Sequence, residues 1–332
     1  MQLSDIGEFG LIRRFAPRFA AAAKAAGQGI GDDCAVLPLS NGRVQLVTTD
    51  LLLEDRHFLR DRITPANLGH KSLAVNLSDM AAMGGTPTAA FLSLGLPAAT
   101  ELDWIDRFFD GLRQLTEDTG CPLLGGDTTR AEKLVINITV LGEMAADQVK
   151  YRAGAQPGDV LAVTGALGDS AGGLRLLLED RPLDGSEAQQ LLAAHHRPQP
   201  QLAAGRWLAT RPEVHAMLDV SDGVDSDVRH IMERSDVGAQ IALETLPVSA
   251  PLKALSQRYG WPTHECALTG GEDYVLLCSI AGDAFGTVAQ AFTQETGTPL
   301  QPIGKVTPGH QLTYTCDGKT TTLAGHGFDH FR

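Results

Sequence analysis

Several classes of protein are excluded by what this sequence does not contain. Its 332 residues include five widely spaced cysteines and no CxxC pair, so neither a zinc site nor a disulfide framework is expected. No run approaches the ~18 to 20 apolar residues of a membrane span. Asp5, Glu8, Arg13 and Arg14 interrupt the N-terminal stretch, which therefore does not resemble a signal peptide. We expect a cytoplasmic protein without a membrane partner.

Basic residues and several enzyme signatures are also scarce or missing. The chain has 27 Lys and Arg against 40 Asp and Glu, a net charge of −13, which argues against a nucleic-acid partner because such surfaces are basic. No GxxxxGK[ST] motif occurs, which excludes a P-loop NTPase. The protein-kinase signatures and the GxSxG elbow of α/β hydrolases are missing too.

The patterns that are present alternate between strand and helix, which favours an α/β or α+β fold. At this length we expect two domains, residues 1–150 and 151–332, joined by a linker within Tyr151–Gly158. Helices are predicted over Pro65–Met83, Glu101–Thr119, Ala171–Glu179, Gln199–Ala209, Val224–Arg234 and Phe285–Thr293. Strands are predicted over Val44–Thr49, Ala89–Leu96, Cys121–Leu124, Leu134–Leu141, Asp159–Thr164, Ala216–Val220, Tyr274–Ile280 and Pro302–Val306.

Short acidic motifs recur along the chain, most of them next to apolar runs. They are Gly31-Asp32-Asp33, Thr48-Thr49-Asp50, Asn76-Leu77-Ser78-Asp79, Gly125-Gly126-Asp127-Thr128-Thr129, Asp219-Val220-Ser221-Asp222-Gly223 and Gly270-Gly271-Glu272-Asp273. We expect these carboxylates at the ends of strands or helices. Two like charges about 4 Å apart repel by roughly 4 kcal/mol at an effective dielectric near 20. A fold that gathers them needs a counter-charge, and Mg²⁺ is a cation that takes oxygen ligands.

Asp79 is the most informative of these acids. It falls near the C-terminal end of the predicted helix Pro65–Met83, where the helix macrodipole favours cations. A single acid there could be a solvated surface residue, and the other motifs could be turns or, for Ser221 or Asp222, a helix N-cap. The recurrence of the pattern favours a shared metal site over these separate explanations. His195-His196 is predicted to be a helix end and not a ligand pair.

Taken in order, the motifs resemble those of the thiamine-monophosphate kinase family, within the aminoimidazole-ribonucleotide-synthetase-like ATP-binding superfamily. The similarity extends from about Asp5 to Phe331. Besides the acidic motifs it rests on His57-Phe58, on Lys71-Ser72-Leu73-Ala74-Val75 before Asn76, on Thr164-Gly165, on Leu167-Gly168-Asp169-Ser170-Ala171 and on Gly327-Phe328-Asp329-His330-Phe331. The resemblance implies ATP-dependent phosphorylation of thiamine monophosphate to thiamine diphosphate, with several Mg²⁺ ions. It also implies a homodimer formed through the sheet of the N-terminal α/β domain, and a C-terminal α/β domain that completes the site.

The resemblance also implies roles for particular residues. Those implied to hold Mg²⁺ are Asp33, Thr48, Thr49, Asp50, Asp79, Asp127, Asp219 and Asp222. Those implied to contact ATP are Gly126, Asp127, Arg152 and Ser221, and those implied to contact thiamine monophosphate are His57, Glu272 and Phe328. Phe328 stands where the family has Tyr or Trp, so the aromatic ring is kept and its polar edge is lost. No residue is assigned to the adenine base, and no general base is assigned.

The chemistry of the residues agrees with this function. Phosphoryl transfer depends mainly on positioning and charge neutralisation, and an acceptor phosphate is already ionised near neutral pH. An acid such as Glu272 and an aromatic ring such as Phe328 suit a cationic thiazolium. Two alternatives stay open: another ATP-using enzyme of the superfamily, or a non-catalytic metal- or nucleotide-binding protein. A cysteine within the first 32 residues, expected of a selenophosphate synthetase, is absent, as is the C-terminal cysteine expected of a hydrogenase-maturation relative.

Overall fold

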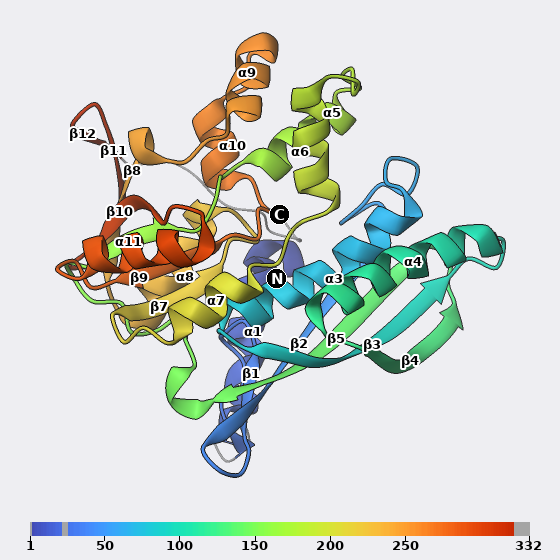
Figure 1. Cartoon of the computed structure of the whole chain (residues 1–332), viewed down its shortest axis with the longest axis horizontal. Coiled ribbons are helices and arrows are strands. Elements are labelled where there is room, and N and C mark those ends of the chain that lie inside the picture. The colour runs from blue at the N-terminus through green and yellow to red at the C-terminus, as the bar shows by residue number, and fades with distance from the viewer. Residues whose placement is uncertain (1, 22–25, 322–332) are drawn as a thin grey trace.

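Two β-sheets, each flanked by helices, make up the protein (Figure 1). The computed structural model describes residues 2–21 and 26–321. The first sheet has the strand order β1-β2-β5-β3-β4, with β1 Ala35–Pro38, β2 Arg43–Leu53, β3 Thr86–Leu96, β4 Leu123–Arg130 and β5 Val135–Ala145. Only the β3–β4 pair is parallel. The α/β architecture expected from the sequence is confirmed.

The second sheet has the order β12-β11-β8-β10-β6-β9-β7. Its strands are β6 Val160–Val163, β7 Val214–Asp219, β8 Gly238–Ala242, β9 Leu276–Ile280, β10 Gln301–Thr307, β11 Leu312–Cys316 and β12 Lys319–Thr321. The chain passes from the first sheet to the second between β5 and β6, the region of the expected linker. The division into domains 1–150 and 151–332 stays a prediction.

Helix α3, Pro65–Ala82, lies at the centre of the molecule and is almost entirely buried. The Thr64 side chain accepts a hydrogen bond from the Asn67 N–H, which caps the helix N-terminus. Together with α4, Leu102–Thr119, this helix covers one face of the first sheet (Figure 1). The two helices approach closely at Gly111, where an added Cβ would lie 1.8 Å from the carbonyl oxygen of Ala66. Both helices confirm the sequence prediction.

Helices of the second half form two groups. Near the second sheet lie α7 Leu202–Ala209, α8 Val224–Ser235 and α11 Phe285–Thr296; a separate layer contains α5 Asp169–Leu178, α6 Ser186–His196, α9 Ala250–Tyr259 and α10 Thr263–Thr269 (Figure 1). This layer has its own small core, which includes Leu191, Leu252 and Trp261. His195 and His196 are the last residues of α6, as predicted. Near the N-terminus lie α1 Leu3–Phe15 and a short 3₁₀ turn.

The largest core joins the two halves around α3. Leu77 and Met80 of α3 belong to the same cluster as Met217 of β7 and Leu276 of β9. The C-terminal end of α3 therefore packs beside the ends of strands from the second sheet. Of the helices within residues 2–21 and 26–321, none is long and apolar enough to cross a lipid bilayer.

Two sequence expectations about the acidic motifs are wrong. Asp50 was expected at a strand end, but β2 continues to Leu53 and places Asp50 inside it. Asp127 was expected between a strand and a loop, but it lies inside β4. Glycine and threonine suggested turns, yet pairing with β3 and β5 extends both segments because ladder hydrogen bonds override weak local preferences.

Candidate active site

Three carboxylates from distant parts of the chain meet where the two halves join. Asp33 precedes β1, Asp79 lies in the last turn of α3, and Asp219 ends β7. One oxygen from each lies within 4.8 Å of the others. The group exists because the core places the end of α3 against the end of β7.

The hydrogen bonds around this group satisfy only part of its carboxylate oxygens. Thr48 Oγ1 donates to Asp79 Oδ2, and Ser78 Oγ donates to Asp219 Oδ2 at 2.5 Å. Among the described residues, the buried Oδ2 atom of Asp33 has no hydrogen-bond partner, and buried polar atoms of this kind call for an explanation such as a bound ion. The all-oxygen donor set fits Mg²⁺.

Burial and mutual repulsion raise the pKa of several of these carboxyl groups. Burial is the main cause for Asp79, whose pKa is well above its usual value, with Asp50 and Asp219 adding to the shift. Burial, followed by the charge of Asp33, raises the pKa of Asp219 to about 7. Burial, followed by the charge of Asp222, raises the pKa of Asp50 to about 6. A cation would let all of them ionise together near neutral pH.

Arg152 supplies one positive charge to this region. Its Nη2 and Nε atoms lie 2.5 Å and 3.1 Å from Asp33 Oδ1, and its backbone N–H donates to Asp32 Oδ1 at 2.7 Å. Nearby carboxylates, chiefly Asp33, raise the pKa of Arg152 against the effect of burial. The segment expected as a linker therefore contributes directly to the site.

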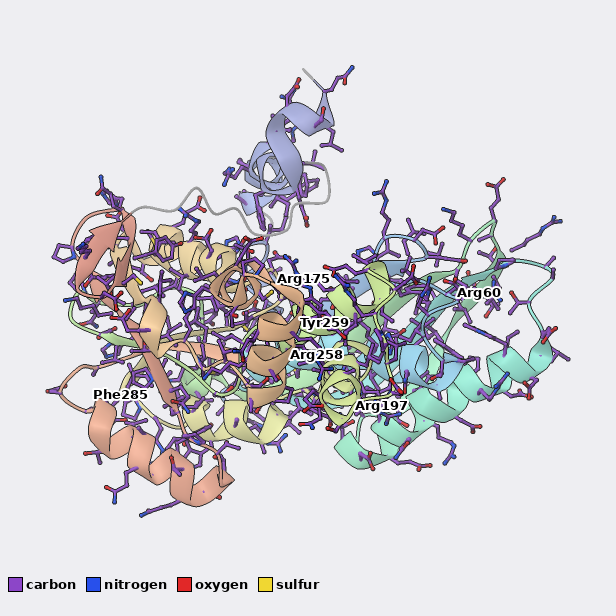
Figure 2. All side chains as sticks on the ribbon, turned by 90° about the horizontal axis from the view of Figure 1, so that it is seen from above. Arg60, Arg175, Arg197, Arg258, Tyr259 and Phe285 are labelled. Carbon is purple, nitrogen blue, oxygen red and sulfur yellow. The ribbon has the colours of Figure 1, made fainter. Side chains whose placement is uncertain are left out.

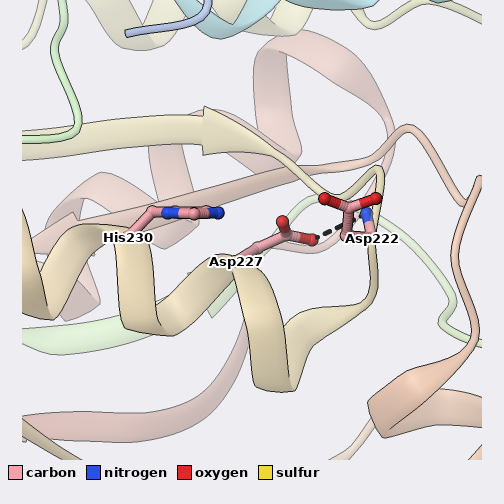
Figure 3. A group of neighbouring side chains, drawn as sticks. All are labelled: Asp222, Asp227 and His230. Carbon is pink, nitrogen blue, oxygen red and sulfur yellow. Dashed lines mark hydrogen bonds between the residues drawn. The ribbon is translucent and has the colours of Figure 1, made fainter. Parts of the chain in front are cut away.

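A second group contains Asp222, Asp227 and His230, drawn in Figure 3. Their donor atoms lie within 4.8 Å of one another, and the Asp222 N–H donates to Asp227 Oδ2 at 3.3 Å (Figure 3). Asp222 lies just before α8, whereas Asp227 and His230 are one turn apart on α8. Burial lowers the pKa of His230 to about 3, so its ring is neutral at physiological pH. Of these three residues, the sequence prediction named only Asp222. The i, i+3 spacing of Asp227 and His230, which places them on one face of a helix, was the signal that could have identified them.

Two residues with an implied Mg²⁺ role, Thr49 and Asp127, lie away from both groups. Thr49 is exposed and bonds to Ile138, Asn137 and Thr139, so its hydroxyl faces away from the neighbouring buried Thr48. Asp127 is exposed on the edge strand β4. The row of paired residues that starts at Asp127 continues through Ser93 on β3 and Asn137 on β5 to Leu51 on β2. That row separates β4 from β2 by three strand spacings, about 14 Å.

Gly126, implied to contact ATP, accompanies Asp127 on β4. Its φ is +153°, and an added Cβ would lie 1.7 Å from the carbonyl oxygen of Leu92. Only glycine allows β4 to lie this close to β3 at that point.

A cavity of about 1230 Å³ adjoins the acidic region. Its lining includes Asp50, His57, Ser221 and Glu272, and also Arg175 of α5, labelled in Figure 2. His57 Nδ1 accepts a hydrogen bond from the Leu53 N–H at 2.9 Å. Ser221 follows β7, and its carbonyl oxygen accepts a hydrogen bond from the Glu272 N–H at 2.7 Å. Phe328 lies outside the residues that the structure describes.

Glu272 is held by residues that the sequence prediction did not include in the site. Lys71 Nζ lies 3.0 Å and His195 Nδ1 lies 3.2 Å from Glu272 Oε2. The sequence analysis named Lys71 in a family motif but gave it no role in the site. Its i, i+3, i+7 spacing with Leu68 and Val75 places a charged residue on an apolar stripe, which was the missed signal.

The two sheets, the acids at their junction and the adjoining cavity define an AIR synthase-related protein. The N-terminal domain model of that family matches residues 31–144, and the C-terminal domain model matches residues 156–317. Within it, the chain belongs to the thiamine-monophosphate kinase family. It is 39% identical to thiamine-monophosphate kinase of Escherichia coli strain K12 over 98% of each chain, and 34% identical to the Bacillus subtilis enzyme over 98% of this chain and 99% of the relative.

Solved structures agree with this assignment. A structure of AaThiL complexed with AMPPCP and TMP superposes with a TM-score of 0.88, at 33% identity and 99% coverage of both chains. Thiamine monophosphate kinase from Aquifex aeolicus gives a TM-score of 0.83 at 32% identity, covering 97% of this chain and all of the other.

Proposed function

We propose that this protein transfers the terminal phosphate of ATP to thiamine monophosphate and thereby forms thiamine diphosphate. The observation that carries the proposal is the junction of Asp33, Asp79 and Asp219 next to a cavity of about 1230 Å³. The relative complexed with AMPPCP and TMP supports the same pair of substrates. Relatives of the same family cover nearly the whole chain, which favours this function over the alternatives.

The acids would hold Mg²⁺, which neutralises charge on the donor and acceptor phosphates. In this arrangement Asp33, Asp79 and Asp219 form one cation site, with Asp50 beside it. Asp222 belongs to a second site, with Asp227 and His230 as its neighbours. Thr48 orients Asp79 by donating a hydrogen bond to it. Thr49, whose hydroxyl faces the other side of β2, would act through its backbone only.

The remaining residues bind and orient the two substrates. Arg152, which pairs with Asp33, would balance phosphate charge. Ser221 lines the cavity, and its carbonyl oxygen accepts a hydrogen bond from the Glu272 N–H. Glu272 and His57 line the part of the cavity proposed for thiamine monophosphate. No general base is needed, because the acceptor phosphate is ionised near neutral pH.

We further propose that the protein is a homodimer that uses the outer face of the first sheet. Leu51, Phe91 and Leu124 on this sheet are 54%, 38% and 64% exposed. An exposed apolar face with an unpaired edge strand is a typical association surface. Gly126 and Asp127 lie on this edge strand, far from the acids of their own chain. They would therefore reach a site belonging to the second copy.

Release of ADP, coupled to NADH oxidation, tests the activity. Thiamine monophosphate with ATP and Mg²⁺ is expected to give turnover, and chromatography should identify thiamine diphosphate. Selenide, a purine intermediate and carbamoyl phosphate serve as competing substrates. Faster turnover of one of them would contradict the proposed substrate, and no ATP turnover with any of them would favour a non-catalytic binding protein.

Mixing two inactive variants tests the shared site. Asp79→Asn and Asp127→Asn are each expected to be inactive alone. If Asp127 acts on the neighbouring copy, one site in each mixed dimer is intact, and random exchange restores about a quarter of the wild-type activity. If Asp127 acts within its own chain, the mixture stays inactive.

A further inference from the structure

Lys71 is a buried cation in contact with the acid proposed to bind the substrate. Its side chain has 0% exposure, and Nζ donates to Glu272 Oε2 at 3.0 Å. The pair connects α3 of the first half with the loop before β9 in the second half. Lysine side chains are almost never fully buried unless they are paired. Lys71 lies eight residues, about 12 Å along the helix, from Asp79.

His195 approaches the same carboxylate oxygen from α6. Its Nδ1 atom lies 3.2 Å from Glu272 Oε2 and 3.0 Å from the hydroxyl of Ser170 on α5. Burial lowers the pKa of His195, and Lys71 lowers it further, so the ring is neutral. In the tautomer that carries its proton on Nδ1, His195 donates to Oε2 beside Lys71. Within the described part of the chain, no hydrogen bond or ion pair involves Oε1.

The backbone around Glu272 is fixed as firmly as its side chain. Glu272 has a φ of +64°, an uncommon conformation for a residue with a Cβ. The Glu272 N–H donates to the Ser221 carbonyl oxygen, and the Asp273 carboxylate accepts hydrogen bonds from the N–H groups of Gly168 and Ser170. The side chain nevertheless keeps 26% exposure and lines the cavity. One oxygen is thus anchored and the other is available to a ligand.

We propose that Lys71, with His195, is a positioning residue that keeps the Glu272 carboxylate ionised and oriented toward the cationic ring of thiamine monophosphate. The inference rests on the proposed function, since it names how the same cavity recognises its substrate. Lys71 does not itself touch the substrate ring.

The charges around Glu272 explain why a lysine is needed. Burial by itself raises the pKa of this carboxyl group, but Lys71 and then His195 outweigh it and lower the pKa to about 2. His196 on α6 and, on its own loop, Asp273 and Tyr274 also interact electrostatically with Glu272. None of these carries a positive charge at neutral pH, because burial lowers the pKa of His196 to about 3. Without Lys71, Glu272 would take up a proton at a much higher pH.

Calorimetric binding of thiamine monophosphate to wild type and to Lys71→Met, from pH 6 to pH 8.5, tests this idea. The ratio of the two affinities at each pH cancels the titration of the substrate's own phosphate. We expect Lys71→Met to bind about ten- to hundredfold more weakly at pH 6, as for loss of a charge-assisted contact, and the deficit to shrink as pH rises. AMPPCP affinity should stay within about twofold. Lys71→Arg keeps the positive charge, so the ratio of its affinity to that of wild type should not depend on pH.

Lys150→Met is the matched control. Lys150 is a half-buried lysine. In the part of the chain that the structure describes, its Nζ donates to the carbonyl oxygens of Arg211 and Val214 and does not contact Glu272. Its removal tests the general effect of losing a partly buried lysine. It should leave the affinity ratio independent of pH.

A double-mutant cycle separates positioning from general structural damage. Because Lys71 acts through Glu272, Lys71→Met with Glu272→Gln should bind thiamine monophosphate as Glu272→Gln alone does. This double variant leaves no unpaired charge buried, so it stays informative if Lys71→Met does not fold. A further tenfold loss in the double variant, or a ratio independent of pH in Lys71→Met, would overturn the inference. If wild type neither binds nor phosphorylates thiamine monophosphate, the proposed function itself fails.

Discussion

Replacing Asp79 by Asn should stabilise the metal-free protein and abolish its activity. Asp79 lies in the last turn of α3, where the macrodipole disfavours an anion by about 0.3 to 1 kcal/mol. Its carboxylate oxygen lies within 4.8 Å of those of Asp33 and Asp219. One like-charge pair at that distance repels by about 3.5 kcal/mol at an effective dielectric near 20. Asn removes the charge and keeps an oxygen that can accept the hydrogen bond from Thr48.

The net gain is smaller than the full repulsion, because protons already relieve part of it. Burial and the neighbouring acids raise the pKa of Asp79, so some of its charge is absent at neutral pH. We expect a gain of about 1 to 2 kcal/mol at pH 8 in EDTA, which corresponds to a rise in Tm of about 2 to 8 °C. At pH 5.5 the gain should shrink, since wild type is then protonated.

Differential scanning fluorimetry in EDTA, together with the ADP-release assay in Mg²⁺, measures both effects. The matched control is Asp118→Asn, because Asp118 lies near the C-terminal end of α4 but is exposed and outside both acidic groups. It should change Tm by less than about 1 °C and leave turnover intact. A lower Tm for Asp79→Asn at pH 8, or near-normal turnover at saturating Mg²⁺, would refute the reasoning.

Three further outcomes are expected. The pKa of Asp219 is raised to about 7, so the metal-free folded state binds more protons than the unfolded chain between about pH 4 and 7, and its stability falls as pH rises through that window. The Mg²⁺-induced rise in Tm should therefore be larger at pH 8 than at pH 5.5. An equal rise at both pH values would contradict competition between protons and Mg²⁺. Gly111→Ala should cost about 1 to 3 kcal/mol in urea unfolding through overpacking against Ala66, whereas Gly286→Ala, with open space around it, should not. Phe91→Lys should shift the protein to monomer in analytical ultracentrifugation, and a wild-type sedimentation coefficient would place the interface elsewhere.

The sequence predicted those elements that a long periodic pattern specifies, and it missed those that depend on contacts between distant residues. The apolar spacing of Leu73, Leu77 and Met80 is enough to define α3, because a helix with one buried stripe repeats every three to four residues. The short helices α9 and α10 and strands such as β8 were not assigned from the sequence. They are only five to ten residues long and carry few periodic positions, so tertiary packing decides them.

The sequence by itself determined the composition of the acidic motifs and the family resemblance, because both are properties of residue order. Tertiary structure alone decided which acids share a site. Asp33, Asp79 and Asp219 come together because α3 packs against β7, whereas strand pairing carries Asp127 to the opposite edge of the first sheet. The contact of Lys71 with Glu272 joins residues 201 positions apart. Long-range packing and strand register produce such contacts, and no local pattern in the chain encodes them.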